Sequence, residues 1–453
     1  TFAHQYVNQD DVWRWHSTVF NQGWTHGNHV TAAGSLAYRI YDQERSLSYL
    51  KLDGEGEATL LQNWQATLSY QKSQDSEVRD KPDGSDFRQA VTDTETYGLT
   101  FQADGDLGPG VLVWGLDYYH DEVDSDASSA RRRPVADDSS YDTFGAYSQY
   151  QWDATEKLQI SFGARASYFH ADWGKVFNRT TGLDESGDGD WSNLSFNARG
   201  VYLLNDRHSV FAGISQGFRA PNLNDLTGSE VANSSDEVVG ATSVDSEKVI
   251  SFELGERWES SKLALSGSVF YTIIDDPITR VNDNTGMTPV VRIQNGEEGY
   301  LYGVEFDGTW QLNDQWQARA NATFQDGKEK KLSEVGGDIT EDTIRRLSPI
   351  SGSIALKWTH PSERFWLEGV LLGAATQNNL QSNVAAGTRD NQRIPANGTP
   401  GYLVANLYAG VKATDNIDLT FGLENLTDED YRVHGSGVNE TGINARFGAK
   451  VSW

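Results

Sequence analysis

Residues 442–453 decide the fold, and they read Gly-Ile-Asn-Ala-Arg-Phe-Gly-Ala-Lys-Val-Ser-Trp. Apolar residues occupy every second position from Ile443 to Trp453, and polar or small residues fill the positions between them. A period of two residues is that of a β-strand with one apolar and one polar face. The segment therefore predicts a long strand that separates an apolar from a polar environment.

The same alternation recurs along nearly the whole chain. It is clear in residues 158–168, 316–324, 403–411 and 417–423, and no segment shows a sustained helical period. Counting back from the C-terminus, we expect about eighteen strands of the length found in transmembrane barrels. They are residues 442–453, 416–426, 401–412, 363–377, 347–359, 314–326, 299–312, 261–275, 246–258, 207–219, 191–204, 156–170, 141–152, 110–122, 95–105, 58–71, 38–52 and 1–10.

Tight turns and long polar loops alternate between these strands. The long loops are expected near residues 72–94, 121–140, 171–190, 222–245, 276–298, 327–346, 378–400 and 427–441. This alternation is typical of a transmembrane antiparallel β-barrel, whose short turns face the periplasm and whose long loops face outside. A soluble β-sandwich or propeller shares the period of two, but its strands are shorter or repeat at a fixed interval. Solubility without detergent would favour that alternative.

The composition excludes several classes of protein. The chain has 453 residues, a formal net charge of −28 and no cysteine. Without cysteine it has no disulfide, no thiolate metal site and no cysteine nucleophile. Its acidic balance argues against nucleic acid as a partner, because phosphate is neutralised by basic patches. No apolar run of about 18 residues is present, so a helical membrane span is excluded.

Two motifs give the chain a family resemblance. One is Phe218-Arg219-Ala220-Pro221, followed by Asn222-Leu223, where a strand enters a long loop. The other is Asn425-Leu426-Thr427-Asp428-Glu429-Asp430-Tyr431, just before the last strand. On these motifs the chain resembles the TonB-dependent receptors, which are active transporters of the bacterial outer membrane. Phe447 and Trp453 in the last strand also resemble the C-terminal aromatic signal for insertion into that membrane.

The resemblance implies a barrel of twenty-two strands around an N-terminal plug. This sequence shows no plug-like segment, so we expect residues 1–453 to be a partial barrel domain without the plug and about the first four strands. Truncation is the preferred explanation over a plugless pore. The implied function is uptake of a scarce siderophore, haem, cobalamin or glycan-like ligand, energised by TonB through the missing plug. The implied surroundings are outer-membrane lipid and lipopolysaccharide, and the resemblance allows a partner lipoprotein or other outer-membrane subunits.

Three side chains are candidate ligand-binding residues. His16 and His434 lie in predicted outer loops, where histidine is either a haem or metal ligand or an exposed residue that binds nothing. Arg219 of the first motif either clamps an anionic substrate or pairs with barrel-wall acids such as Glu253. Residues 222–244 contain no histidine, which argues against a haem ligand in that loop.

Two acidic groups suggest calcium, which prefers oxygen ligands. They are Asp121, Asp124 and Asp126 in one predicted loop, and Asp184, Asp188 and Asp190 in another. Neither spacing is that of a recognised calcium loop, and a solvated acidic surface is the alternative interpretation.

No catalytic group is predicted, so the chain is not expected to be an enzyme. Ser215 and His208 lie seven residues apart on one strand, too far for a direct hydrogen bond. The alternative function is a passive porin or a structural outer-membrane barrel, which a plug encoded upstream would exclude. A barrel lipase or protease is the third hypothesis, and turnover of a lipid or peptide would support it.

Overall fold

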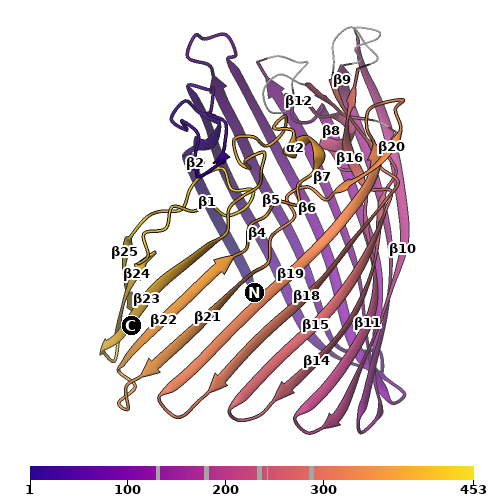
Figure 1. The fold of residues 1–453 in the computed structure, drawn as a ribbon. Helices are drawn as coiled ribbons and strands as arrows, with labels where there is room; N and C mark the ends of the chain where they lie inside the picture. The colour runs from indigo at the N-terminus through magenta and orange to yellow at the C-terminus, as the bar shows by residue number, and fades with distance from the viewer. Residues whose placement is uncertain (129–132, 178–182, 232–236, 242, 285–289, 453) are drawn as a thin grey trace.

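The computed structural model describes residues 1–128, 133–177, 183–231, 237–241, 243–284 and 290–452, and is nearly all β (Figure 1). Each of the predicted strands corresponds to one long strand. The bounds are β1 (Phe2–Trp13), β4 (Tyr38–Ala58), β5 (Leu61–Asp80), β6 (Arg88–Leu107), β7 (Gly110–Ala127), β8 (Asp137–Thr155), β9 (Leu158–Phe177), β10 (Asp184–Asn205), β11 (His208–Arg219), β14 (Glu247–Glu259), β15 (Leu263–Asp275), β18 (Glu298–Gln311), β19 (Trp316–Leu332), β21 (Ser351–Thr359), β22 (Phe365–Ala374), β23 (Tyr402–Thr414), β24 (Ile417–Glu424) and β25 (Asn444–Val451). The prediction of an antiparallel β-barrel wall is confirmed.

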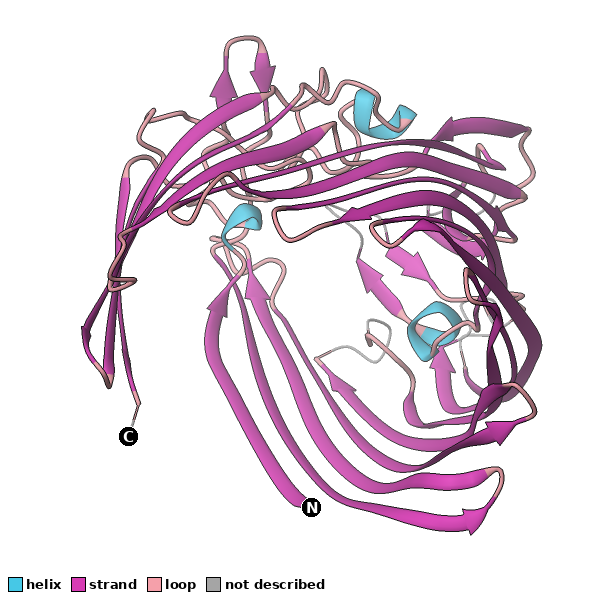
Figure 2. Ribbon diagram, turned by 90° about the horizontal axis from the view of Figure 1, so that it is seen from below, coloured by secondary structure: helices cyan, strands magenta, loops and turns pink. Residues whose placement is uncertain are grey.

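The long strands form one curled antiparallel sheet. Each long strand pairs with the next one along the chain, from β1 with β4 to β24 with β25. Within the described residues no register pairs β1 with β25, and Figure 2 shows a ring that is incomplete between the two chain ends. The hairpins at one end of the wall are short, and the long loops gather at the other end.

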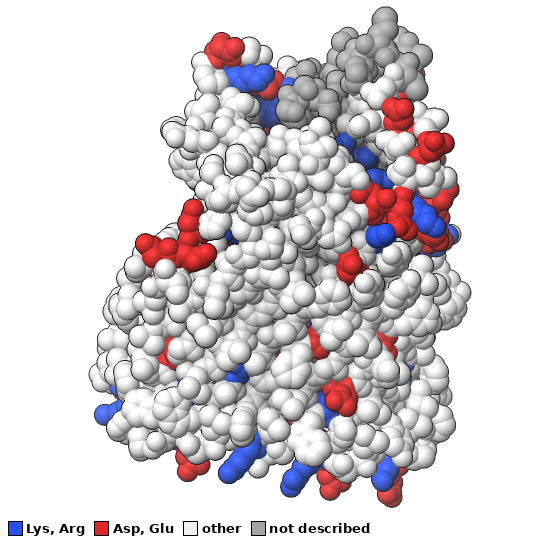
Figure 3. Space-filling view, viewed as in Figure 1, with Lys and Arg blue, Asp and Glu red and all other residues white. Residues whose placement is uncertain are grey.

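The two faces of the wall differ as the alternation predicts. On β14 and β15, Leu254 and Val269 are paired in register and are 58% and 48% exposed on the outer face. Their neighbours Glu253 and Ser268 alternate with them and face the lumen. Charged residues gather at the two ends of the outer surface, and the belt between them carries few (Figure 3). An exposed apolar belt of this kind is the lipid-facing surface of a membrane barrel.

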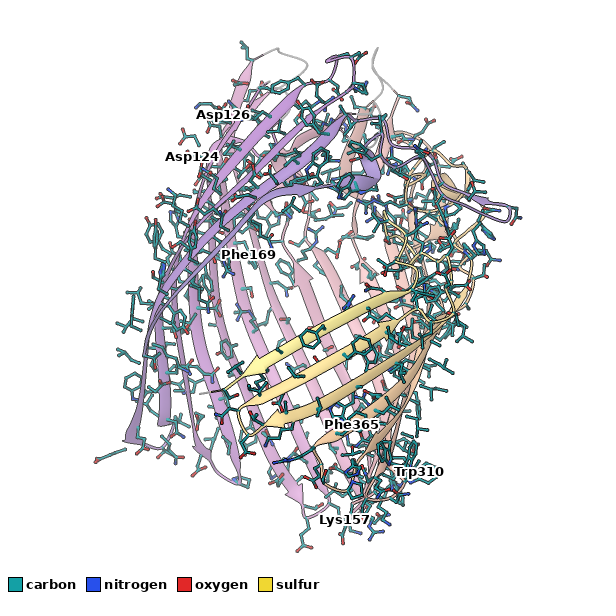
Figure 4. All side chains as sticks on the ribbon, turned by 90° about the vertical axis from the view of Figure 1, so that its left-hand side faces the viewer. Asp124, Asp126, Lys157, Phe169, Trp310 and Phe365 are labelled. Atoms are coloured by element: carbon teal, nitrogen blue, oxygen red, sulfur yellow. The ribbon has the colours of Figure 1, made fainter. Side chains whose placement is uncertain are left out.

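Aromatic residues border the belt at the short-turn end. Trp310 and Phe365 lie there in Figure 4, and the Phe365 ring packs 5.9 Å from that of Trp358. At the long-loop end the rings of Tyr271 and Tyr300 stack 6.1 Å apart. Tyrosine and tryptophan prefer the interface between hydrocarbon and water, so these two sets of rings mark the borders of the membrane.

The wall between β4 and β10 is taller than the sequence predicts. The loops expected near residues 72–94, 121–140 and 171–190 are largely strand, because β5 to β10 continue well beyond the apolar belt. Polar cross-strand pairs hold these extensions: the Lys72 ammonium lies 3.1 Å from Glu95, and Gln74 donates to Asp93 at 2.8 Å. A period-two pattern of polar residues carries no hydrophobic signal, so the prediction assigned the extensions to loops.

Shorter elements fill the long-loop end. They are η1 (Trp15–Ser17), β2 (Thr25–His26), β3 (His29–Val30), α1 (Leu223–Thr227), β12 (Ser229–Val231), β13 (Glu237–Val239), β16 (Ile278–Asp283), β17 (Val290–Asn295), β20 (Ile339–Thr343) and α2 (Ser382–Ala385). The strands β12, β13, β17 and β16 form a separate small sheet. Among the described residues, no helix has the length and apolarity needed to cross a membrane.

An arginine introduced on either face of the wall tests which face contacts lipid and which faces the lumen. We expect Leu254→Arg to destabilise the barrel by about 2–4 kcal/mol, because the guanidinium would lie in hydrocarbon. Ser215→Arg places the same side chain on the lumen face of the neighbouring strand β11 and is expected to cost little. Urea unfolding in lipid vesicles measures both, and equal losses for the two variants would show that the faces are assigned wrongly.

Candidate functional site

The long loops from the two ends of the chain meet across the opening of the ring. Residues 14–37 lie against residues 390–400 and 430–437, and the Ala32 amide donates to the Asn391 carbonyl at 2.7 Å. The Trp24 indole donates to Asp430 at 3.0 Å, and the Arg432 guanidinium lies 5.1 Å from the Trp24 ring. These contacts connect the first and last parts of the wall at the long-loop end.

A basic pocket lies beneath this contact, on the lumen side. It has a volume of about 70 Å³. We call it the outer basic pocket, and it is lined by His16, Ser17, Ser35, Leu36, Arg39, Arg79, Lys81, Asp86, Asp390, Asn391, Gln392 and Arg393. Four permanently charged cations thus face two carboxylates in a protein whose formal net charge is −28.

Two arginines of the pocket are direct cross-strand neighbours. Arg39 on β4 and Arg79 on β5 are paired in register, an arrangement that is unfavourable for like charges. Glu77 compensates Arg39 through Nε–Oε1 and Nη2–Oε2 distances of 2.8 and 3.2 Å. Arg79 is only 9% exposed, its Nε has no hydrogen-bond partner among the described residues, and its Nη2 lies 3.8 Å from Asp86. The wall therefore holds a buried guanidinium that is incompletely neutralised.

Asp390 anchors the loop that closes the pocket. Its side chain is fully buried, and it accepts hydrogen bonds from Arg346 Nη2 at 2.7 Å and Arg345 Nε at 2.8 Å. Burial alone raises the pKa of Asp390, but Arg346 and Arg345 outweigh burial and hold that pKa below its ordinary value. One carboxylate thereby joins the β20–β21 connection to the β22–β23 loop.

His16 lies in the pocket as a neutral hydrogen-bond acceptor. Its Nε2 lies 3.1 Å from Arg393 Nη2, and because a guanidinium only donates, that ring nitrogen carries no proton. Burial, followed by the charges of Arg393 and Arg14, lowers the pKa of His16 to about 3. Burial and the neighbouring Arg346 charge also lower the pKa of Arg393 to about 10. Burial is the larger cause of both shifts, and the neighbouring arginine charges add to it.

The other outer-loop histidines join loops to one another. His434 Nδ1 lies 2.9 Å from the Thr399 hydroxyl, and its burial and the Arg346 charge lower its pKa to about 4. His29 Nδ1 donates to the Gly398 carbonyl at 2.7 Å. His16, His29 and His434 are therefore engaged in contacts with the β22–β23 loop. Among the described residues, no group of three or more histidine, aspartate or glutamate side chains is placed to hold a metal ion.

These contacts predict a pH dependence of the loop assembly. The ordinary histidine pKa is 6.5 and the pKa of docked His16 is about 3, so undocked loops bind the proton more readily. Docking is therefore complete above about pH 6.5 and weakens as the pH falls towards 3, by up to about tenfold per unit before solvent screening. Hydrogen exchange of residues 14–37, corrected for intrinsic rates, measures how often these loops open. The loops should open more often at about pH 5.5 than at about pH 7.5, because His16 binds a proton more readily in the undocked state.

Variants that cannot titrate supply the control. In His16→Gln the amide oxygen replaces Nε2 as acceptor, and in His434→Asn the amide replaces Nδ1. The double variant should show a nearly flat corrected opening across the same pH range. An opening that rises equally in the native protein and the double variant would show that other groups control docking.

Arg219, at the end of β11, lies beside two acidic side chains. Its Nη1 lies 2.7 Å from Asp225, and its Nη2 lies 3.8 Å from Glu247. Pairing with an acid was one of the two alternatives, but Glu253 was the wrong example. The register between β11 and β14 places Glu247 opposite Arg219 and places Glu253 opposite Gly213.

The rest of the first motif turns the chain over the wall. Ala220 and Pro221 are buried, and the Pro221 carbonyl accepts a hydrogen bond from the Tyr141 hydroxyl at 2.9 Å. The Phe218 ring lies 5.7 Å from that of Phe169, and Asn222 caps α1 through a reciprocal pair of hydrogen bonds with Asp225. The motif positions α1 against the upper wall, where Leu226 is fully buried.

The second motif organises the connection from β24 to β25. Asn425 has a φ of 52° and is 2% exposed, and its side-chain amide donates to the carbonyls of Glu429 and Thr441 at 2.9 Å. The Tyr431 ring packs 4.3 Å from that of Tyr402. Asp428 accepts a bond from the amide of residue 443, and Leu426 is 43% exposed. Phe447 is 73% exposed on β25, and Trp453 lies outside the described residues.

The two predicted calcium groups are not in loops. Asp121, Asp124 and Asp126 lie on β7, where alternation sends Asp121 to the opposite face from the other two. Asp124 and Asp126 stand on the outer side of the upper wall (Figure 4). The second group, Asp184, Asp188 and Asp190, lies on β10, and Asp190 is engaged by Tyr168 and His170. Strand geometry spreads these carboxylates along the wall.

The sequence singles out His16, but it gives no motif for the cations that surround it. Arg39, Arg79, Lys81 and Arg393 are single basic residues without a motif, far apart along the chain. A usable signal was present for two of them: Arg39 and Arg79 occupy lumen-face positions at the long-loop ends of consecutive strands. No comparable signal placed residues 390–393 beside them.

Comparisons with known proteins agree with this architecture. A family model described as "TonB dependent receptor-like, beta-barrel" matches residues 1–426. The "Pesticin receptor" of Yersinia enterocolitica is 24% identical over 305 residues, covering 65% of this chain and 40% of the relative. The "Ferric aerobactin receptor" of Klebsiella pneumoniae is 22% identical over 384 residues, covering 76% and 49%. The chain thus spans less than half the length of these relatives.

A solved structure has the same fold. "Copper transporter OprC" superposes with a TM-score of 0.77 and 18% sequence identity, covering 95% of this chain and 71% of that one. At this identity the likeness concerns the barrel architecture.

Proposed function

The chain belongs to the TonB-dependent receptor-like β-barrel family, and from that premise we propose that it takes up a scarce, anionic metal chelate of the siderophore type across the outer membrane. Members of this family are outer-membrane receptors and transporters for siderophores, haem and metals, and they work with TonB. The chemistry required of the barrel is recognition and passage of a solute, without a covalent step.

The outer basic pocket is the observation that carries the choice of ligand class. Arg39, Arg79, Lys81 and Arg393 line it, and Arg39 and Arg79 lie at the long-loop ends of their strands. A concentration of cations in a chain of net charge −28 attracts an anion locally while the rest of the surface repels it.

The names of the relatives favour a metal chelate over haem. The "Ferric aerobactin receptor" is by its name a receptor for a ferric complex. An axial histidine for haem would have to be free, whereas His16, His29 and His434 are engaged with other loops. We assign residues 1–453 the role of the barrel domain, and TonB would act on a plug within it.

Uptake in an iron-starved host tests this proposal. Cells that produce the complete receptor should accumulate radioactive iron from a panel of anionic ferric chelates, with at least one chelate taken up well above background. Uptake should disappear when TonB is deleted, because the solute moves against its gradient. Uptake that is unchanged without TonB would favour a passive pore, and no uptake from any anionic chelate would refute the proposed ligand class.

A further inference from the structure

A second basic pocket lies in the lumen near the short-turn end. Its volume is about 330 Å³, and side chains of β8, β9, β10, β11 and β14 line it. Arg199 and Arg257 provide the charge, and Gln149, Gln151 and Gln159 provide amide groups. These positions alternate with exposed apolar residues such as Phe162, so they face away from lipid. We call this the lower lumen pocket.

Its two arginines lack the partners that other arginines of the wall possess. Arg165 makes a two-fold contact with Asp117 at 2.8 Å, and Arg319 pairs with Glu368. By contrast, no ion pair joins Arg199 or Arg257 to a carboxylate within the described ranges, and no carboxylate lines the pocket. Arg199 instead lies 4.4 Å over the Phe211 ring, which holds its guanidinium in place without neutralising it.

The neighbouring wall carries the opposite charge. A pocket of about 380 Å³ on β4, β5 and β6 is lined by Asp53, Glu55 and Asp104 together with neutral residues. An anion in the lumen is repelled by that wall and attracted to the wall of β8–β14. Arg199 and Arg257 are both exposed, so their guanidinium groups can take up an anion from the lumen without first breaking an ion pair.

We propose that the lower lumen pocket is a second anion-binding station, which receives a carboxylate-bearing solute on its way from the outer basic pocket to the short-turn end. This inference rests on the proposed function for the identity of the travelling solute. The two arginines bind carboxylate oxygens, and the glutamine amides donate further hydrogen bonds. Weak binding suits such a station, because a solute has to leave it as well as enter it.

Citrate binding to the purified chain in detergent tests the station directly. Equilibrium dialysis with radioactive citrate should find two bound citrates per chain. Arg199→Gln with Arg257→Gln should remove one, and Lys81→Gln with Arg393→Gln should remove the other. Arg199→Lys with Arg257→Lys keeps the charge and should retain most of the binding. Lys157→Gln, in a short hairpin outside both pockets, is the matched control.

Two outcomes would overturn the station. One is that the Arg199 and Arg257 variant still binds two citrates, and the other is that citrate binding is lost only with the outer pocket. In cells, the same variant should slow uptake of the chelate found above by about tenfold, while the affinity of the cell surface for that chelate stays within about twofold, because the outer site captures it. If the variant instead admits more of a large antibiotic while it takes up the chelate at the normal rate, the station is wrong. The two arginines would then hold an acidic protein segment in the lumen.

The two proposals fail in different ways. If no chelate is taken up but two citrates bind as described, the proposed function fails and the station stands. If uptake depends on TonB but the Arg199 and Arg257 variant transports and binds normally, the station fails and the proposed function stands.

Discussion

Asp390→Ala is expected to release the β22–β23 loop and abolish uptake while leaving the barrel wall folded. The substitution leaves the guanidinium groups of Arg345 and Arg346 without their shared carboxylate, close to Arg393. Removing one partner of a buried ion pair costs about 3–5 kcal/mol, and the lower figure applies because both arginines are about one-third exposed. A loss of about 3 kcal/mol corresponds to roughly a hundredfold more frequent opening of the loop.

Hydrogen exchange of residues 377–400 measures this opening, and urea unfolding reports the wall separately. Asp83→Asn is the control, because Asp83 is an exposed carboxylate in another outer loop. The effect should be confined to residues 377–400, to residues 14–37 that contact them, and to the connection that carries Arg345 and Arg346. Unchanged exchange in the Asp390 variant would show that the buried carboxylate does not anchor the loop.

Reversing the charge of Lys81 and Arg393 together should weaken chelate binding by about a hundredfold or more. Each substitution to glutamate changes the local charge by two units, and an effective dielectric constant of about 20 makes such changes worth several kcal/mol at contact distance. The expected result is a higher dissociation constant at the cell surface, with the transport rate at saturation less affected. The loss should shrink at high salt, because the interaction is electrostatic.

Lys157→Glu supplies the matched control for this reversal. Lys157 lies in a short hairpin at the opposite end of the wall (Figure 4), so the same chemical change should leave binding intact. Heat-modifiable migration on gels would confirm that all variants insert as barrels. If Lys81→Glu with Arg393→Glu binds as tightly as Lys157→Glu, the outer basic pocket is not the capture site.

The strand pattern was predictable because each membrane-spanning strand has its own local pattern of apolar and polar residues. Lipid on one side and polar surroundings on the other impose a period of two, so the alternation alone assigns Leu254 and Glu253 to opposite faces. The prediction failed where this contrast ends: Asp121 and Asp190 lie on strands above the apolar belt, where both faces are polar. There the cross-strand partner, which is distant in sequence, keeps the strand extended.

The roles of individual residues were less predictable than their motifs. Arg219 and Asn425 are prominent in sequence, yet both organise turns, Arg219 beside α1 and Asn425 before β25. The histidines were candidates for ligands because of their chemistry alone. Whether an imidazole binds a solute or another loop depends on which groups surround it, and the neighbours of His16 come from residues 393 and 437.

The sequence by itself determined the antiparallel wall, its strand order and the faces of its strands, because each follows from alternation and from connections between neighbours in the chain. Only the tertiary structure decided where the charge lies. Curling the sheet brings Arg393 beside His16 and places Arg199 and Arg257 in one pocket. Electrostatic energy depends on the distance between charges in space. Because the curled sheet brings its last loops next to its first ones, charges that are far apart in the sequence become neighbours.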